Sequence, residues 1–290
     1  MNKSFFQRFI INTIHSLLTI LRIAIMSKWF VSGFKKLSKH KNALILGNGP
    51  SLKDTISKHP DFLKDKTLVC VNHFAETEYY RWLKPEIYVL GAPEMWRNDV
   101  ETFHLNKGKN LFKQISERTE WSLKLFIPAC SKAYKDWQLQ IKKNPKIEIV
   151  FFNNTPGEGS VWFEHFVFNK NWAMPRPHNV LIPSLMIALN LKYKKIYISG
   201  ADHSWMKDVY VSDENRVFLT QKHFYDYNTA EQKTMDNRGN GERHLHEILE
   251  KWTLAFQGYF TIRRYAESRN QSIINITPDS YIDAFEREQI

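Results

Sequence analysis

A glycine-rich turn is the first stretch of the sequence whose residue types could do chemistry. The apolar run 43–46 is followed by Gly47-Asn48-Gly49-Pro50-Ser51, and an apolar run that ends in turn residues predicts a buried parallel strand. The glycines would let a ligand approach the main chain closely. Ser51 could cap a following helix, whose N-terminus attracts anions such as phosphate. The turn therefore predicts a nucleotide site, with a tight turn that binds nothing as the alternative.

Polar side chains also stand at the ends of two other predicted strands. Asn72 follows the run 67–71, and Asp202 follows the run 195–199 and Gly200. With Asn48, they offer amide groups for ribose, phosphate or base atoms and a carboxylate for sugar hydroxyls, although each could instead cap a turn. Asp202 and His203 are adjacent, but no second His or carboxylate lies at metal-ligand spacing, so we predict no metal.

The elements that position these residues alternate along the chain, which predicts an α/β fold with a doubly wound, mostly parallel sheet. Parallel strands have their carboxyl ends at one edge, which is where nucleotides bind in such sheets. The predicted strands are 43–46, 67–71, 86–90, 123–127, 146–151, 195–199 and 272–276, and the predicted helices are 51–59, 75–83, 110–118, 131–142, 181–191 and 243–268.

Two long stretches, about 152–180 and 201–242, show no clear periodicity. The first holds several Gly and Pro residues among aromatics, and the second is rich in Tyr, His, Asp and Asn. Both follow predicted strands, so both should lie near the Gly47–Ser51 turn. Long irregular segments in a compact domain are often lids or binding loops. We therefore predict lid segments inserted into one nucleotide-binding α/β domain that spans residues 41–290.

Residues 1–40 differ from the rest of the chain. They contain a strongly apolar helix with basic residues and no Asp or Glu, because the first acidic residue is Asp54. Arg22 interrupts the apolar run, and the charge-free stretch before it is short for a bilayer span. The segment predicts a basic amphipathic helix in the interface of an anionic membrane surface. The alternatives are packing on the protein's own surface or on a second copy in a homo-oligomer.

The composition points to an anionic partner. The chain of 290 residues carries a formal net charge of +11, which suits anionic lipid or a phosphorylated substrate. No zinc-finger spacing or aromatic RNA-binding signature accompanies this charge, so nucleic acid is not expected as a partner.

Three motifs resemble those of bacterial family 42 sialyltransferases and of a related group that includes hydroxymethylpterin pyrophosphokinase-like proteins. The motifs are Gly47-Asn48-Gly49-Pro50-Ser51-Leu52, Val69-Cys70-Val71-Asn72-His73-Phe74, and the stretch 185–202, which ends in Ser199-Gly200-Ala201-Asp202. The resemblance implies a Rossmann-like fold of the GT-A-like variety. It implies a metal-independent, inverting glycosyltransferase without a cofactor. Such an enzyme would move a sialic-acid-like or other 2-keto sugar acid from a CMP-sugar to a glycan or lipid-linked acceptor at the inner face of the cytoplasmic membrane.

The resemblance also implies roles for individual residues. Tyr210 and Arg176 would stabilise the departing phosphate, and His246 or His244 would be the general base, since imidazole titrates near neutral pH. The residues expected to hold the nucleotide are Gly47, Asn48, Gly49, Pro50, Ser51, Asn72, Asn179, Gly200 and Asp202.

Two departures from the family pattern bear on the identity of the donor sugar more than on the class of nucleotide. A Ser-Gly pair expected before the helix 181–191 is replaced by Asn179-Val180-Leu181, and Leu90-Gly91-Ala92-Pro93 replaces an expected Asn. One alternative, which the resemblance to the pyrophosphokinase-like group allows, is an ATP- and Mg²⁺-dependent pyrophosphokinase-like transferase. Another is a membrane-attached binding or scaffold protein without catalytic activity.

Overall fold

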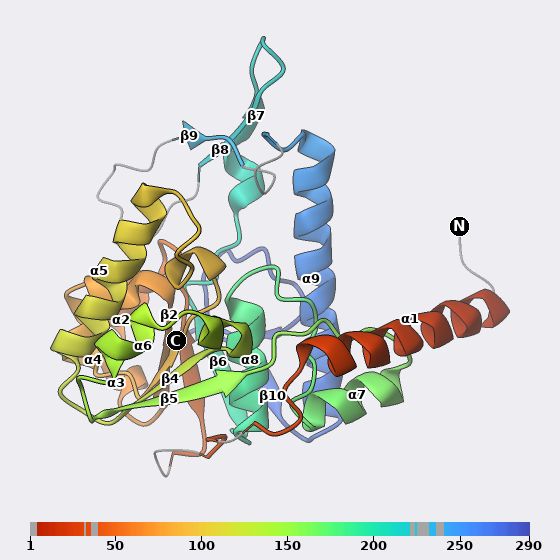
Figure 1. Ribbon diagram of the computed structural model, residues 1–290. Helices are drawn as coiled ribbons and strands as arrows, with labels where there is room; N and C mark the ends of the chain where they lie inside the picture. The colour runs from red at the N-terminus through yellow and green to blue at the C-terminus, as the bar shows by residue number, and fades with distance from the viewer. Residues whose placement is uncertain (1–4, 32, 36–39, 221–223, 225–231, 236–240) are drawn as a thin grey trace.

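A single eight-stranded parallel sheet forms the centre of the fold (Figure 1). The computed structural model describes residues 5–31, 33–35, 40–220, 224, 232–235 and 241–290. The strand order is β11-β10-β6-β1-β2-β3-β4-β5, and every neighbouring pair is parallel. The predicted Rossmann-like α/β fold is confirmed. The strands are β1 (Ala43–Leu46), β2 (Thr67–Val71), β3 (Ile87–Val89), β4 (Leu123–Pro128), β5 (Ile147–Phe152), β6 (Lys195–Ser199), β10 (Ser272–Asn275) and β11 (Glu286–Arg287).

The sheet is buried on both faces, which explains why its strands read as continuous apolar runs. Alternate residues enter two separate cores. Ile45 and Val69 belong to the core beneath α8 (Leu181–Asn190) and α9 (Leu245–Glu267). Leu44 and Cys70 belong to the core beneath α2 (Leu52–Lys58), α5 (Thr102–Arg118) and α6 (Asp136–Ile141). All seven predicted strands are present, and the two-residue β11 is an eighth that the pattern missed.

The helices on the second face differ from the prediction at their starts. Helix α5 begins at Thr102 rather than residue 110, since its first two turns are largely exposed, Phe103 included, and Gly108 weakens the helical pattern. The predicted helices 75–83 and 131–142 are each divided into a 3₁₀ turn and a shorter helix. These pieces are η1 (Asn72–Glu76) with α4 (Tyr79–Leu83), and η3 (Ala129–Ala133) with α6; α3 (Pro60–Leu63) and η2 (Pro93–Met95) are further short turns.

The N-terminal helix α1 (Phe5–Met26) lies beside α7 (Val161–Asn169), a helix in the segment where the sequence showed no periodicity (Figure 1). The side of α1 that faces the domain is mostly polar, although it also carries Ile23, which is buried in the core beneath α8 and α9. Thr19 Oγ1 donates to Glu158 O at 2.8 Å and accepts from Glu158 N at 3.0 Å, and the Arg22 guanidinium pairs with the Glu158 carboxylate at 2.9 Å. Ser27 Oγ donates to Trp172 O at 2.7 Å. The outward side of α1 is apolar, with Phe6 69% and Ile25 74% exposed.

A small antiparallel sheet stands near the start of α9, at the top of Figure 1. Its strands are β7 (Val209–Val211), β8 (Val217–Thr220) and β9 (Gln232–Lys233), and they follow η4 (Trp205–Asp208). Val217 and Leu219 of β8 pack with Ile248 and Trp252 of α9. The described part of the second predicted lid, 201–242, therefore includes a sheet attached to α9, and residues 221–223, 225–231 and 236–240 lie outside the described residues.

Candidate ligand cleft

A cleft of about 2060 Å³ lies at the carboxyl ends of β1 and β6. The chain runs outward from β1 to β5 on one side of the sheet and then returns to β6 on the other side of β1. Ligands of open α/β sheets bind where the strand order reverses in this way. The turns after β1, β2, β3 and β6 line the cleft, together with parts of 154–158, 176–181 and the start of α9.

Asp202 and Ser51 link the two turns at the switch point. Ser51 Oγ donates to Asp202 Oδ2 at 2.9 Å, and Ser51 N donates to Asp202 Oδ1 at 3.3 Å. Ser51 makes no capping hydrogen bond to α2, so its predicted role as a helix cap is wrong. The Asp202 carboxylate itself accepts from the backbone at the start of α2. Burial raises the pKa of Asp202, and the hydrogen bonds from Ser51 only partly offset this.

The glycines of the turn are explained by how closely these two turns pack. A Cβ on Gly49 would lie 1.9 Å from Asp202 Oδ2, and a Cβ on Gly47 would lie 2.4 Å from Gly200 O. Gly49 N donates to Gly200 O at 2.8 Å, and Gly200 has a φ of +66°. Gly47 and Gly49 therefore have no side chain because the two turns pack against each other, and not only because a ligand could approach the main chain there. Gly47, Gly49, Pro50, Gly200 and Asp202 all line the cleft.

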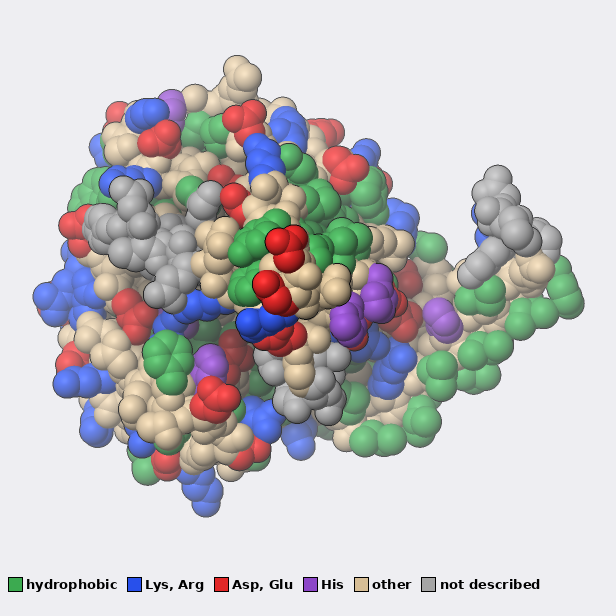
Figure 2. Space-filling view, turned by 90° about the horizontal axis from the view of Figure 1, so that it is seen from above, with side chains coloured by type: hydrophobic (Ala, Val, Ile, Leu, Met, Phe, Trp, Pro, Cys, Tyr) green, Lys and Arg blue, Asp and Glu red, His purple; other side chains and the backbone are tan. Residues whose placement is uncertain are grey.

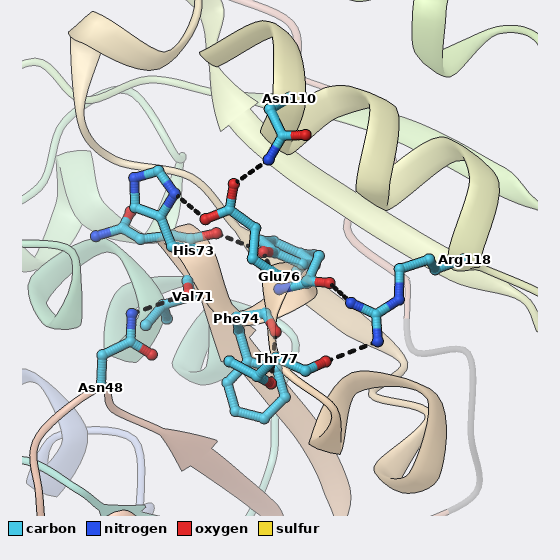
Figure 3. A network of polar contacts seen from close by, with 11 residues as sticks. Asn48, Val71, His73, Phe74, Glu76, Thr77, Asn110 and Arg118 are labelled. Carbon is cyan, nitrogen blue, oxygen red and sulfur yellow. Dashed lines mark hydrogen bonds and ion pairs between the residues drawn. The ribbon is translucent and has the colours of Figure 1, made fainter. Parts of the chain in front are cut away.

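Asn48 and Asn72 lie close together at the ends of β1 and β2, as predicted, and both line the cleft. Asn48 Nδ2 donates to Val71 O at 3.3 Å (Figure 3), while its Oδ1 is buried without a hydrogen-bond partner in the described part of the chain. Asn72 has a left-handed backbone with a φ of 47°, and its Oδ1 accepts from Gly91 N at 3.4 Å. Gly91 belongs to the stretch Leu90-Gly91-Ala92-Pro93, where the motif resemblance led us to expect an Asn.

The turn that carries Asn72 is held by a polar network (Figure 3). Glu76 Oε2 contacts His73 Nδ1 at 2.8 Å, and Asn110 Nδ2 of α5 donates to Glu76 Oε1 at 2.8 Å. Arg118 donates to the carbonyl oxygens of Ala75 and Thr77. Burial disfavours ionised Glu76, but the bonds from His73 and Asn110 outweigh burial and lower its pKa. The network gives Asn72 a fixed position at the cleft.

Arg176 and Asn179 also line the cleft, but they differ in how available their polar groups are to a ligand. Arg176 Nε lies 3.9 Å from Glu158 Oε1, and 46% of its side chain is exposed, so a ligand could contact its guanidinium. Asn179 Oδ1 accepts from Leu181 N at 3.0 Å at the start of α8, and its Nδ2 donates to Tyr259 Oη at 2.7 Å. The Asn179 amide is therefore committed to the protein, and its predicted direct contact with a nucleotide has little support.

Tyr210, His244 and His246 do not line the cleft, although Arg243 and Glu247, on either side of the two histidines, do. Tyr210 is exposed on β7, where its ring stacks on Phe218 and its hydroxyl donates to Gln232 Oε1 at 3.2 Å. His244 and His246 are exposed at the start of α9, with stacked rings 6.0 Å apart. The two rings can stack because His244 is the N-cap residue, whose backbone is extended rather than helical.

Three other histidines line the cleft: His104, His178 and His203. Burial, and then the charges of Arg176 and Lys251, lower the pKa of His178. Burial also lowers the pKa of His203 to about 3. His203 was noticed in the sequence only as a neighbour of Asp202. The residues that surround it come from α8, η4 and α9, and no local pattern could have shown their proximity.

No model of a protein family matches the chain, and no curated protein matches it significantly. Across the described ranges, no group of three or more His, Cys, Asp or Glu residues is arranged to hold a metal ion. The fold and the cleft together define a Rossmann-like α/β protein with a cleft at its switch point.

Proposed function

We propose that the protein is a glycosyltransferase that binds a CMP-sugar in the cleft and transfers a sialic-acid-like or other 2-keto sugar acid. The observation that carries the proposal is the position of the cleft at the switch point, with Asn48, Asn72 and Arg176 facing it. Its volume of about 2060 Å³ exceeds the roughly 300–1,000 Å³ of ordinary small-molecule pockets. The cleft therefore has room for a nucleotide donor and part of a glycan or lipid-linked acceptor together.

The cleft supplies the groups that a single inverting displacement needs. The acceptor hydroxyl oxygen forms the new bond to the anomeric carbon as the bond to the phosphate oxygen breaks, and a base takes the hydroxyl proton. Arg176 would stabilise the departing phosphate, because a guanidinium matches phosphate oxygens. His178 is the base that the cleft favours, since its lowered pKa keeps it neutral. His246 and His244 remain the alternatives from the motif resemblance.

Nucleotide titration by isothermal calorimetry tests this function. We expect CMP and CDP to bind without Mg²⁺, and Arg176→Ala to weaken binding about tenfold or more, as for loss of a charged hydrogen bond. Arg263→Ala is the matched control, because Arg263 has a similar exposure of 48% and pairs with Glu267 instead. Binding of ATP alone with Mg²⁺ would favour the pyrophosphokinase alternative. Binding of none among CMP, CDP, UDP, GDP and ATP would favour the scaffold alternative.

We also infer that α1 and α7 together attach the protein to an anionic membrane surface. Residues Phe6–Met26 form a helix that is long and apolar enough to enter a membrane. Figure 2 shows hydrophobic side chains along this projecting helix. On α7, Trp162 is 73% exposed and Phe166 is also exposed, and Arg8, Lys28 and Lys170 are exposed nearby in the chain. Apolar side chains beside basic ones are typical of helices that bind anionic bilayers.

The orientation of α1 supports contact with lipid along its length. A surface helix of a soluble protein turns its apolar face to the core, whereas α1 turns Ser16, Thr19 and Arg22 to the domain together with the buried Ile23. Ser27, which follows the helix, also bonds to the domain. These hydrogen bonds hold the C-terminal half of the helix against 153–160. The helix therefore lies along the bilayer surface in this proposal, with the domain on the cytoplasmic side.

Co-sedimentation with phosphatidylcholine–phosphatidylglycerol vesicles tests the attachment. We expect Leu17→Asn with Leu21→Asn to reduce binding about tenfold or more, since burial of each leucine in lipid contributes about 1.5–3 kcal/mol. Leu139→Asn on α6 is the control, because Leu139 is 64% exposed and Leu17 is 62% exposed. Unchanged vesicle binding would contradict the inference. Lipid-free dimers that the Leu17/Leu21 variant abolishes would show instead that this surface joins two copies of the chain.

A further inference from the structure

The orientation of the Asn179 amide is fixed by helix α8. Its Oδ1 accepts from two backbone N–H groups, Leu181 N at 3.0 Å and Ile182 N at 3.3 Å. Because these groups can only donate, the atom that faces them must be the oxygen. The amide nitrogen Nδ2 therefore faces Tyr259 and donates a hydrogen bond to its hydroxyl oxygen at 2.7 Å.

The hydrogen bond from Asn179 in turn determines which atom donates in the contact between Tyr259 and His203. Its side chain is fully buried on α9, and burial raises the pKa of the phenol, which stays protonated. Since Tyr259 Oη accepts from Asn179, its own proton is free to donate to His203 Nε2, which lies 2.6 Å away. A neutral imidazole whose Nε2 accepts a hydrogen bond carries its proton on Nδ1. The three residues thus select one tautomer of His203.

The imidazole of His203 is held in place at the cleft. Its ring lies 4.2 Å from the Trp205 ring and 6.1 Å from the Phe256 ring. The backbone of His203 is left-handed, with a φ of 52°, a conformation that costs energy for most residues and is often found at functional sites. His203 lines the cleft, and its Nδ1 is neither enclosed nor hydrogen-bonded to another described residue.

We propose that His203 binds the ligand directly, by donating a hydrogen bond from Nδ1 to a phosphate oxygen of the nucleotide. Asn179 and Tyr259 act as positioning residues that set the tautomer. This inference rests on the proposed nucleotide site. A neutral donor is the kind of group that the motif resemblance assigned to Tyr210, and the structure offers His203 at the cleft for the same task. The Nδ1–H group of His203 stabilises the negative charge that develops on the phosphate without forming an ion pair.

Two variants of the same shape test the donor. Asn and Asp both tolerate a left-handed backbone, but Asn can donate a hydrogen bond to phosphate, whereas an ionised Asp can only accept one and also repels the phosphate. In titrations of the whole chain, we expect His203→Asp to weaken CMP binding about tenfold to a hundredfold, by the range for hydrogen bonds to charged groups. His203→Asn should stay within about fivefold of the original protein, because it restores a donor. Cytidine, which lacks phosphate, should bind the original protein and both variants equally.

The tautomer has its own measurement. Long-range ¹H–¹⁵N spectra of histidine-labelled protein, assigned with His203→Asn, should show the Nδ1–H tautomer of His203, and Tyr259→Phe should shift it toward a mixture. Finding Nε2–H in the original protein would overturn the proposal, as would CMP binding by His203→Asp at the original affinity. If the original protein bound no nucleotide, the proposed function would fail and the phosphate assignment with it. Normal CMP binding with an unaffected His203→Asp variant would sink this inference alone.

Discussion

The Asp202 carboxylate accepts a hydrogen bond from the Ser51 hydroxyl at 2.9 Å and occupies the space that a side chain at position 49 would need. An acidic group therefore sits where the sequence motif suggested that a phosphate would bind, at the start of α2. A second negative charge beside it would be repelled. A bound nucleotide should accordingly place its phosphates toward Arg176 and His203, and leave Asp202 to sugar hydroxyls.

Gly49→Ala tests how closely the two turns pack. The new Cβ would lie 1.9 Å from Asp202 Oδ2, so the carboxylate must move and lose its bonds to Ser51. We expect the free energy of unfolding to fall by about 1–3 kcal/mol, as for other overpacked sites, and nucleotide binding to weaken. Urea denaturation followed by circular dichroism measures the first effect.

Gly258→Ala is the control for that substitution. Gly258 lies inside α9, and its closest neighbour would be the flexible end of Ile182 at 3.2 Å. Alanine favours a helix over glycine by up to about 1 kcal/mol, so this variant should be as stable as the original protein or more so. If both variants lost the same stability, close packing at Gly49 would not be the cause.

Glu164 gives a prediction for pH. Burial raises its pKa from 4.5 to about 7, and the bond from Gly159 and the charge of Arg264 offset this only in part. The folded protein thus holds a proton that the unfolded chain releases, so the free energy of unfolding falls as pH rises from 4.5 to about 7. Glu164→Gln should be more stable than the original protein by up to about 3 kcal/mol near pH 8.

The same pair of proteins should differ little at about pH 3, which is below both pKa values, so that Glu164 is protonated in both the folded and the unfolded chain. The check is urea denaturation of each at both pH values. Parallel pH profiles for the two proteins would show that Glu164 does not titrate in this range.

Thr19→Val tests how α1 is attached to the domain. Thr19 is fully buried, and its hydroxyl bonds both the carbonyl and the N–H of Glu158. Valine has nearly the same shape but leaves both groups without a partner, which costs about 1–3 kcal/mol for each group. We expect faster hydrogen exchange in 155–160. Thr13→Val is the control, since Thr13 is exposed and bonds only within α1; equal exchange in both variants would argue against the attachment.

The sheet could be predicted from sequence because its strands are buried on both faces and read as apolar runs, as Ala43–Leu46 does. Helix α7 could not, since Phe163 and Val167 face the core while Trp162 and Phe166 face outward. Apolar side chains on both sides leave no helical period. Asn48, Asn72 and Asp202, which follow strands β1, β2 and β6, line one cleft as expected, because the carboxyl ends of parallel strands lie at the same edge of the sheet.

The remaining site residues depended on distances that the sequence does not encode. Tyr210 was chosen by its spacing from Asp202, but the chain between them turns into the small sheet on α9. His203 and Tyr259 are 56 residues apart and meet only because α9 crosses the switch point. A strand-end rule cannot find a contact of this kind.

Glu158 joins the N-terminal helix to the cleft. Its carboxylate pairs with Arg22 at 2.9 Å and lies 3.9 Å from Arg176, the arginine proposed to hold the phosphate. A shortened protein that lacks α1, the usual choice for easier purification, would lose Arg22 and leave Glu158 to pair fully with Arg176. The Glu158 carboxylate would then compete with the ligand phosphate for the Arg176 guanidinium. A weak nucleotide affinity of the shortened protein would therefore result from the truncation.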